Sequence, residues 1–295
     1  MRGRADASST RGVDMALTMS VIVCAHNEAH YLAPCLHSLL AQSRPPDELL
    51  VINNASTDET RAVAQQVPHV HVFDEPRKGL VVARETGRLC AVGSVLVYVD
   101  ADCRAPLTWL ERIERRFARD PDLIALSGPY RFYDWDWWGR TLIRAYDFTV
   151  APLTQILVKH VLRIGTIFYG GNFAVRRDAL DRIGGFDTSI EFHGEDTNLG
   201  RRLFAIGKVG LFHDCFLYTS ARRYVAMGKG AVFRLYVRNF TSELLHHRPK
   251  DRTHLDIRSP VSGLQSPVLA KHTGARLGGP GPESGVGSPE TKPLG

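Results

Sequence analysis

Two aspartates after a run of β-forming residues are the part of this sequence best suited to chemistry. Residues 95–99 read Val-Leu-Val-Tyr-Val, and Asp100-Ala101-Asp102 follows directly. Such a run is typical of a buried parallel strand, and open α/β sheets bind ligands where their strands end. On an extended backbone Asp100 and Asp102 point the same way. Two carboxylates there suit Mn²⁺ or Mg²⁺ carrying phosphate oxygens, although Asp-x-Asp also occurs in polar turns.

Polar and basic residues also follow the earlier predicted strands. Neutral hydrogen-bonding groups and acids suit a base and ribose, whereas cations suit phosphate. Singly, each is explained as a solvated or capping loop residue. Because they gather at one edge of the sheet, together they predict a nucleotide pocket. The residues are His26, Asn27, Glu28, Asn53, Asn54, Asp58, Arg77, Lys78 and Arg84.

The elements that position these residues alternate between strand and helix from residue 20 to residue 99. Ser56 and Glu59 have the spacing of a capping box, which predicts a second helix starting at Ser56 and running to about Val67. The alternation indicates an α/β fold with βαβ units and a mostly parallel, Rossmann-like sheet flanked by helices. Strands are expected at 21–24, 49–52, 70–73 and 95–99, and the other two helices at 32–40 and 79–91.

Composition narrows the class of protein. The chain has 295 residues and a formal net charge of +6. Mild basicity without a dense Lys/Arg run suits an anionic substrate or membrane surface rather than nucleic acid. The five cysteines are scattered, which predicts reduced thiols in a cytoplasmic protein. The sequence has no run of 18 apolar residues, so we expect no transmembrane helix, and we interpret 16–25 as a strand rather than a signal segment.

The most unusual segment is 130–138, which holds three of the four tryptophans. An amphipathic helix expected at 109–120 and a strand expected at 123–127 precede this segment. An apolar and basic stretch, 141–168, follows it. Three interpretations are open: a helical subdomain covering an acceptor cleft, a peripheral membrane contact with Trp and Tyr at headgroup depth, or an ordinary pair of core helices.

Glycines and acids mark the segment that follows. Gly170-Gly171 precedes a strand expected to end at Arg176, and the glycines suggest close approach of a ligand. Asp178 is expected to cap a short helix that Gly184-Gly185 ends. Glu195 and Asp196 open another helix. Acids in a first turn are favoured by the helix dipole alone, but a carboxylate there is also a candidate general base.

Cations and a histidine follow. Arg222 and Arg223 come after the last predicted strand, where a paired cation can clamp a diphosphate. His213 is a candidate third metal contact, although a lone His is more often structural. An amphipathic helix is expected at 228–247.

Four segments together resemble the family-2 glycosyltransferases of the GT-A fold. They are Val21 to Glu28, Val51 to Asp58, Asp100-Ala101-Asp102 and Gly194-Glu195-Asp196. The resemblance covers about residues 20–220. It implies an inverting enzyme that moves a sugar from a nucleotide-sugar donor to the hydroxyl of a glycan or lipid-linked acceptor with Mn²⁺ or Mg²⁺, as in polysaccharide or glycolipid biosynthesis.

The resemblance also implies roles for single residues. Asp196, with Glu195 beside it, would supply the catalytic base, and Asp102 of the DxD motif would bind the metal. Asn53 stands where the family most often has Asp; an amide oxygen can still accept from a base N–H. The residues expected to bind the nucleotide-sugar are Ala25, Glu28, Asn53, Lys78, Arg84, Asp100, Arg222 and Arg223, with His213 beside the metal.

The expected organisation is a disordered leader, a nucleotide-sugar-binding half, an acceptor-binding half with the Trp-rich insert, and a disordered Pro/Gly-rich tail. Their ranges are 1–18, 19–128, 129–248 and 249–295. Two other functions are weighed. One is a noncatalytic nucleotide-sugar or membrane-surface binding protein. The other is a sugar nucleotidyltransferase, which typically has a Gly-rich basic loop where this chain has His26-Asn27-Glu28.

Overall fold

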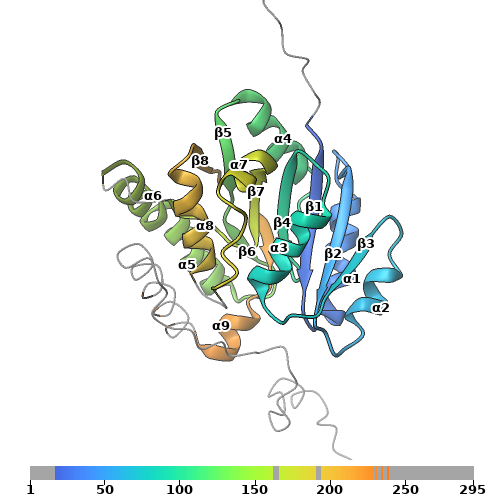
Figure 1. Ribbon diagram of the computed structural model, residues 1–295. Helices are drawn as coiled ribbons and strands as arrows, with labels where there is room; N and C mark the ends of the chain where they lie inside the picture. The colour runs from blue at the N-terminus through green and yellow to red at the C-terminus, as the bar shows by residue number, and fades with distance from the viewer. Residues whose placement is uncertain are drawn as a thin grey trace, which may run out of the picture. The chain divides into compact units, whose positions relative to one another are not determined.

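A mixed sheet forms the centre of the molecule (Figure 1). The computed structural model describes residues 17–161, 166–190 and 194–228, together with residues 230, 234 and 238. Within this part of the chain, seven strands pair in the order β3-β2-β1-β4-β7-β5-β8. Their bounds are Met19–Ala25 (β1), Glu48–Asn54 (β2), His71–Glu75 (β3), Val95–Asp100 (β4), Leu123–Ser127 (β5), Asn172–Arg176 (β7) and Lys208–Leu211 (β8).

The four strands of the predicted βαβ units are parallel to one another. β1 pairs with both β2 and β4, and β2 pairs with β3 at the sheet edge. β7 enters between β4 and β5 and runs antiparallel to both. Because β7 is antiparallel, its first residues lie at the edge where β4 ends, with Asn172 opposite Val99.

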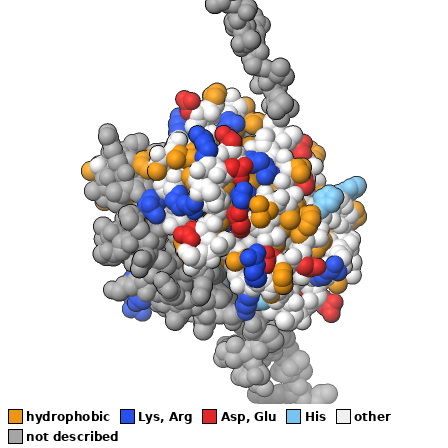
Figure 2. Space-filling view, viewed as in Figure 1, with side chains coloured by type: hydrophobic (Ala, Val, Ile, Leu, Met, Phe, Trp, Pro, Cys, Tyr) orange, Lys and Arg blue, Asp and Glu red, His pale blue; other side chains and the backbone are white. Residues whose placement is uncertain are grey.

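Helices cover both faces of the sheet, each over its own apolar core. One core lies under α1 (Ala29–Leu40), α2 (Thr60–Gln65) and α4 (Trp109–Arg119), and Trp109 is fully buried in it. The other lies under α3 (Leu80–Cys90), α7 (Arg177–Arg182) and α8 (Glu195–Phe204). On this second face, Arg88 pairs with Glu85 and Asp181, and charges of both signs lie interspersed over α3 and α7 (Figure 2).

A smaller two-stranded sheet joins β6 (Tyr130–Phe132) to β9 (Leu217–Thr219) in parallel. The Trp-rich segment runs from β6 into α5 (Trp137–Phe148), which α6 (Val150–Ile156) and the π-helical η1 (Leu157–Val161) follow. A short helix, α9 (Arg222–Met227), follows β9. Trp135 packs with Phe132 and Tyr224.

Two predicted helix starts are wrong. α2 begins at Thr60 with Glu59 as its N-cap and no capping side chain, so Ser56 and Glu59 form no capping box. Ser56 Oγ instead accepts a hydrogen bond from the backbone N–H of Asn27 at 3.1 Å. Arg176, and not Asp178, is the N-cap of α7, since Asp178 lies inside the first turn.

The other predicted elements of the described chain are present within a few residues of their expected bounds. Gly184 and Gly185 end α7 with φ of +77° and +76°. Most of the expected helix at 228–247, the leader to residue 16 and the tail at 249–295 lie outside the described residues. All five cysteines are free thiols. In the residues described, we find no helix both long and apolar enough to cross a membrane.

Candidate active site

Asp100 ends β4 and lies against a pair of glycines. Its Oδ2 accepts a hydrogen bond from the Tyr130 hydroxyl at 3.4 Å. A Cβ on Gly171 would lie only 1.9 Å from that oxygen, so only glycine fits there. The sequence attributed this glycine to the close approach of a ligand, whereas the group that approaches it is the carboxylate of Asp100. Asp100 and the backbone at Gly171 therefore form one wall of the site.

A buried arginine joins Asp100 to the acids of α8. Arg84 on α3 is 3% exposed; its Nη2 lies 3.9 Å from Oδ1 of Asp100, and its Nη1 lies 3.5 Å from Oε1 of Glu195. A Cβ on Gly170 would meet Cβ of Asp196 at 3.1 Å and Arg84 Nη2 at 3.2 Å. The structure thus places Arg84, which the sequence assigned to the nucleotide-sugar, among carboxylates. Its charge offsets the repulsion between them.

Asp196 has an unusual protonation equilibrium. Burial, with a further contribution from the charge of Glu195, raises the pKa of Asp196 to about 7. Arg84 and a 2.7 Å hydrogen bond from the Thr197 amide to Oδ1 act in the opposite direction. A carboxyl group with a pKa near the working pH is suited to accept and release protons.

Asp102 lies beside a second cation, which comes from far along the chain. Nη2 of Arg222 is 2.9 Å from Oδ2 of Asp102, and the Thr219 hydroxyl is 3.3 Å from Oδ1. Arg222 also donates two hydrogen bonds to the carboxylate of Glu28, at 2.6 and 2.8 Å. Glu28 is 2% exposed, and the guanidinium lies 4.5 Å from the centre of the Tyr31 ring. Asp102, Glu28 and Arg222, all predicted site residues, are therefore one connected group.

Two adjacent asparagines end β2 and serve different purposes. The amide of Asn54 donates to the Arg77 carbonyl at 2.7 Å and accepts from the Gly79 amide at 2.9 Å, so it holds the loop that carries Lys78. Asn53 donates to Asp74 Oδ1 at 2.8 Å and is 8% exposed. Ala25 is paired with Asn53 across β1 and β2.

The remaining predicted site residues lie as follows. Lys78 is exposed on the loop before α3, and Arg223 is partly exposed in α9. The ring of His213 stacks on Phe148 at 5.5 Å between centroids. Among the described residues, no group of three or more His, Cys, Asp or Glu has the arrangement of a metal site. His213 is thus not drawn into such a group with Asp102.

Sequence reasoning missed several residues of the site. Tyr130 and Thr219 each bond to one of the two key aspartates, and Asp74 with Arg61 holds Asn53. Hydroxyls in strands give no sequence signal of their own. Asp74 could have been found, because it follows a predicted strand as Asn53 does.

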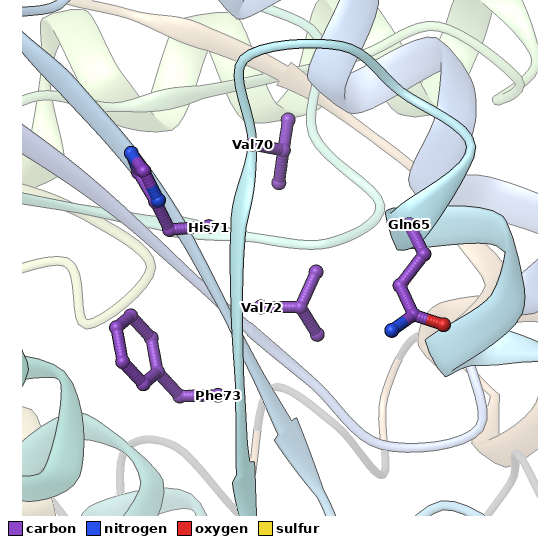
Figure 3. Close-up of a pocket in the computed structure, with 5 residues that line it drawn as sticks. All are labelled: Gln65, Val70, His71, Val72 and Phe73. Carbon is purple, nitrogen blue, oxygen red and sulfur yellow. The ribbon is translucent and has the colours of Figure 1, made fainter.

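A hollow also lies along the edge strand β3, lined by Gln65, Val70, His71, Val72 and Phe73 (Figure 3). Val72 points toward the Gln65 side of the strand, and His71 and Phe73 point the other way. The lining contains none of the predicted site residues, so we do not assign the catalytic site to it.

The architecture is that of the GT-A class of α/β folds, as the sequence predicted. A solved structure with this architecture is the mannosyltransferase PcManGT from Pyrobaculum calidifontis in complex with GDP-Man and Mn²⁺. Its TM-score is 0.56 at 21% sequence identity, and the match covers 80% of this chain and 66% of that one.

The sequence then places the chain within one family of that class. Residues 20–184 match the model of Glycosyl transferase family 2, and the chain belongs to this family. Two similar proteins come from Haloferax volcanii. Glycosyltransferase AglE is 26% identical over 185 residues, covering 60% of this chain and 58% of AglE. A glucosyl-dolichyl phosphate glucuronosyltransferase is 25% identical over 189 residues, covering 61% and 59%. The chain thus spans less than two thirds of either relative.

Proposed function

We propose that this chain is an inverting glycosyltransferase, which moves a sugar from a nucleotide-diphosphate sugar to an acceptor hydroxyl. The observation that carries the proposal is the buried Arg84, which holds Asp100 and Glu195 around the Gly170-Gly171 backbone. This brings the end of the nucleotide-side strand β4 against the acids of α8. Family membership and the GT-A fold support the proposal.

Asp196 acts as the general base. Its carboxylate accepts the proton of the acceptor hydroxyl while the acceptor oxygen bonds to the anomeric carbon, whose bond to the diphosphate oxygen breaks. Attack from the face opposite the diphosphate inverts that carbon. A pKa of about 7 leaves a useful fraction of Asp196 ionised at neutral pH while keeping it basic. Glu195 contributes by its charge, which helps to raise that pKa.

The nucleotide lies over the ends of β1, β2 and β4 in this proposal. Asn53 and Ala25 face the base, and Asp100 faces the ribose. Glu28 keeps Arg222 in place through two hydrogen bonds. Arg222, Arg223 and Lys78 supply positive charge to the departing diphosphate. Arg84 is buried among acids, so its part is to position Asp100 and Glu195.

Asp102 offers oxygen ligands to a hard divalent cation, which would compete with Arg222 for Oδ2 of that carboxylate. The carboxylate and the neighbouring Thr219 hydroxyl are oxygen groups, and Mg²⁺ or Mn²⁺ commonly takes one or two carboxylates together with substrate phosphates. Asp102 would hold the ion, with His213 retained as a candidate from the sequence. When bound, the ion would neutralise charge on the diphosphate. The Mn²⁺ in the PcManGT structure supports this assignment.

The test is calorimetric binding of UDP and GDP, each with Mn²⁺, Mg²⁺ or EDTA, to the wild type and to Asp102→Ala. We expect one nucleotide to bind in a metal-dependent manner and the variant to lose that dependence. Asp196→Asn should bind the same nucleotide and turn over no donor. Nucleotide binding without turnover by the wild type, across a donor and acceptor screen, would favour a noncatalytic binding protein. Absence of binding under every condition would refute the proposal.

A second observation favours a lipid-linked acceptor at a membrane surface. Large exposed apolar side chains lie along α5, α6 and η1, and we call this surface the outer face. Trp137 and Trp138 stack on each other there at 3.9 Å while remaining 59% and 66% exposed. Arg140 and Arg144 are exposed on the same helix. Exposed Trp beside Arg suits the headgroup region of an anionic bilayer. Large apolar residues complete this face: Leu142, Phe148, Val150, Leu153, Ile156, Leu157 and Val161.

We therefore propose peripheral contact with anionic lipid through this face, and the name of the glucosyl-dolichyl phosphate relative supports a lipid-linked acceptor. Flotation with anionic and neutral vesicles tests it. Wild type should float with anionic vesicles, Trp137→Ala/Trp138→Ala should stay in solution, and Leu89→Ala, at a 67% exposed position on α3, should behave as wild type. Equal flotation of the Trp variant and the wild type would contradict the proposal.

A further inference from the structure

The side-chain amide of Asn53 is fixed in one orientation by a carboxylate. Its Nδ2 lies 2.8 Å from Oδ1 of Asp74, the residue opposite it on β3. An ionised carboxylate can only accept hydrogen bonds, so the nitrogen of the amide must face Asp74 and the oxygen must face away. Asn53 Oδ1 is buried and has no hydrogen-bond partner among the residues that the structure describes.

Asp74 is itself held in place. Nε of Arg61 on α2 lies 3.0 and 3.2 Å from the two carboxylate oxygens of Asp74. The hydrogen bond from Asn53, together with Arg61, lowers the pKa of Asp74, and burial opposes the shift. Asp74 therefore stays ionised through the neutral range and keeps accepting from Asn53. Asp74 and Arg61 are each half exposed, so the pair can be altered without opening a core.

An oriented, unpartnered acceptor is selective among bases. Asn53 lies beside the small Ala25, its register partner at the end of β1. Buried polar groups are normally satisfied, so an orphaned acceptor at a ligand-binding edge indicates a donor on the ligand. The ring N–H of uracil or guanine can donate to it. Ring N3 of cytosine is an acceptor and cannot. A freely rotating amide would lack this preference, because it could offer its NH₂ group instead.

We propose that Asp74, held by Arg61, is a specificity-determining residue that fixes Asn53 as a hydrogen-bond acceptor and so selects donors whose base carries a ring N–H. This inference rests on the proposed function, because it needs a nucleotide at the ends of β1 and β2. Asp74 acts through Asn53 and is a positioning residue. At position 53, where the family usually has a carboxylate, this chain has an amide that faces the base in our proposal. The carboxylate of Asp74 lies behind that amide and orients it.

The experiment measures binding of UDP, GDP and CDP by calorimetry with Mn²⁺ present, on the full chain. Wild type should prefer UDP or GDP to CDP by about tenfold or more, since an acceptor facing an acceptor leaves both unsatisfied. Asp74→Ala releases the amide, so the preference should fall severalfold. Asp178→Ala, which removes an exposed acid paired with Arg182, should leave it unchanged. Thermal melting checks that each variant is folded.

Exchanging the residue types at positions 53 and 74 provides a stricter test of the proposal. Asn53→Asp alone would place two carboxylates where a 2.8 Å hydrogen bond now stands, and all three nucleotides should bind weakly. Asn53→Asp/Asp74→Asn restores a donor–acceptor pair and should recover the wild-type preference. Arg61→Gln should shift the preference as Asp74→Ala does, but less.

The possible outcomes distinguish a failure of the Asp74 inference from a failure of the proposed glycosyltransferase function. An unchanged preference in folded Asp74→Ala, or no recovery in the double variant, would overturn this inference and leave the glycosyltransferase proposal intact. A wild-type chain that binds no nucleotide would remove both. If Asp74→Ala fails to fold, the Arg61→Gln and double variants decide the question by the same ratio.

Discussion

Arg222 and Asp102 form an ion pair in which Nη2 of the arginine lies 2.9 Å from Oδ2 of the aspartate. Both terminal NH₂ groups of the same guanidinium donate hydrogen bonds to the carboxylate of the buried Glu28. Through these contacts, Arg222 in the segment after β9 connects to Glu28 after the end of β1 and to Asp102 after the end of β4. In the proposed reaction the donor diphosphate arrives at this point, and its charge gives Arg222 an alternative anionic partner.

Arg222→Gln should destabilise the fold and weaken donor binding. Removing one partner of a largely buried ion pair leaves the other charge uncompensated, and we expect a loss of about 3 kcal/mol in the free energy of unfolding. Urea denaturation measures it. Arg182→Gln is the control, because its exposed pair with Asp178 at 3.7 Å should contribute under about 0.5 kcal/mol. Equal losses in both variants would mean that the Glu28–Arg222–Asp102 group contributes little to stability.

Activity should rise with pH through about 7, because in the proposed mechanism the ionised form of Asp196 is the base. The pH profile of kcat/KM measures this.

The free energy of unfolding should change with pH in the opposite direction to activity. An unfolded Asp titrates near 3.9, so between about pH 4 and 7 the folded chain binds the extra proton and loses stability as pH rises. Asp196→Asn should lack that part of the slope. A wild type and a variant with parallel stability profiles would show that the pKa of Asp196 is not raised.

Arg84→Gln should move the activity profile to higher pH. Arg84 lowers the pKa of Asp196, so removing its charge raises that pKa further and shifts ionisation of the proposed base to higher pH. Arg84→Lys keeps the charge and should restore most of the original profile, although with fewer contacts. The measurement is the pH midpoint of kcat/KM for the three proteins. A midpoint shared by all three would exclude electrostatic coupling between Arg84 and Asp196.

Gly171→Ala should displace Asp100 and weaken nucleotide binding by about tenfold or more, because the loss of one buried hydrogen bond has an effect of that size. The added Cβ would lie 1.9 Å from Asp100 Oδ2 and 2.4 Å from the Tyr130 hydroxyl. Gly170→Ala is the matched comparison, since its nearest contact is 3.1 Å and needs only a small adjustment. Calorimetry on both variants measures the effect. Similar affinities would show that the site tolerates movement of Asp100.

The sequence was sufficient for the parts of the site that lie next to regular elements. Asp100 and Asp102 follow an unmistakable buried strand, and Glu195 and Asp196 begin a helix, so their places could be predicted. Contacts between distant segments could not. Nothing local pairs Glu28 with Arg222, or Arg84 with Asp100 and Glu195. Those pairings depend on how the strands are ordered.

Strand order is also why the antiparallel position of β7 between β4 and β5 was not predicted, although the strand itself was. Hydrophobic periodicity indicates that residues 172–176 form a strand, but it carries no information on direction or neighbours. The predicted capping box failed for a related reason. The Ser56 hydroxyl accepts a hydrogen bond from the backbone N–H of Asn27 in another loop, a tertiary contact that a local motif does not encode.

The antiparallel β7 has a consequence for how the protein could be divided. Strand β7, from the later part of the sequence, stands between β4 and β5 and closes the edges of both. A fragment that stops at residue 128 would expose the hydrogen-bonding edges of two apolar strands, which invites self-association. Residues 19–128 are thus not an exchangeable module by themselves. A chimera that keeps these residues would also have to retain residues 170–176, because β7 pairs with both β4 and β5.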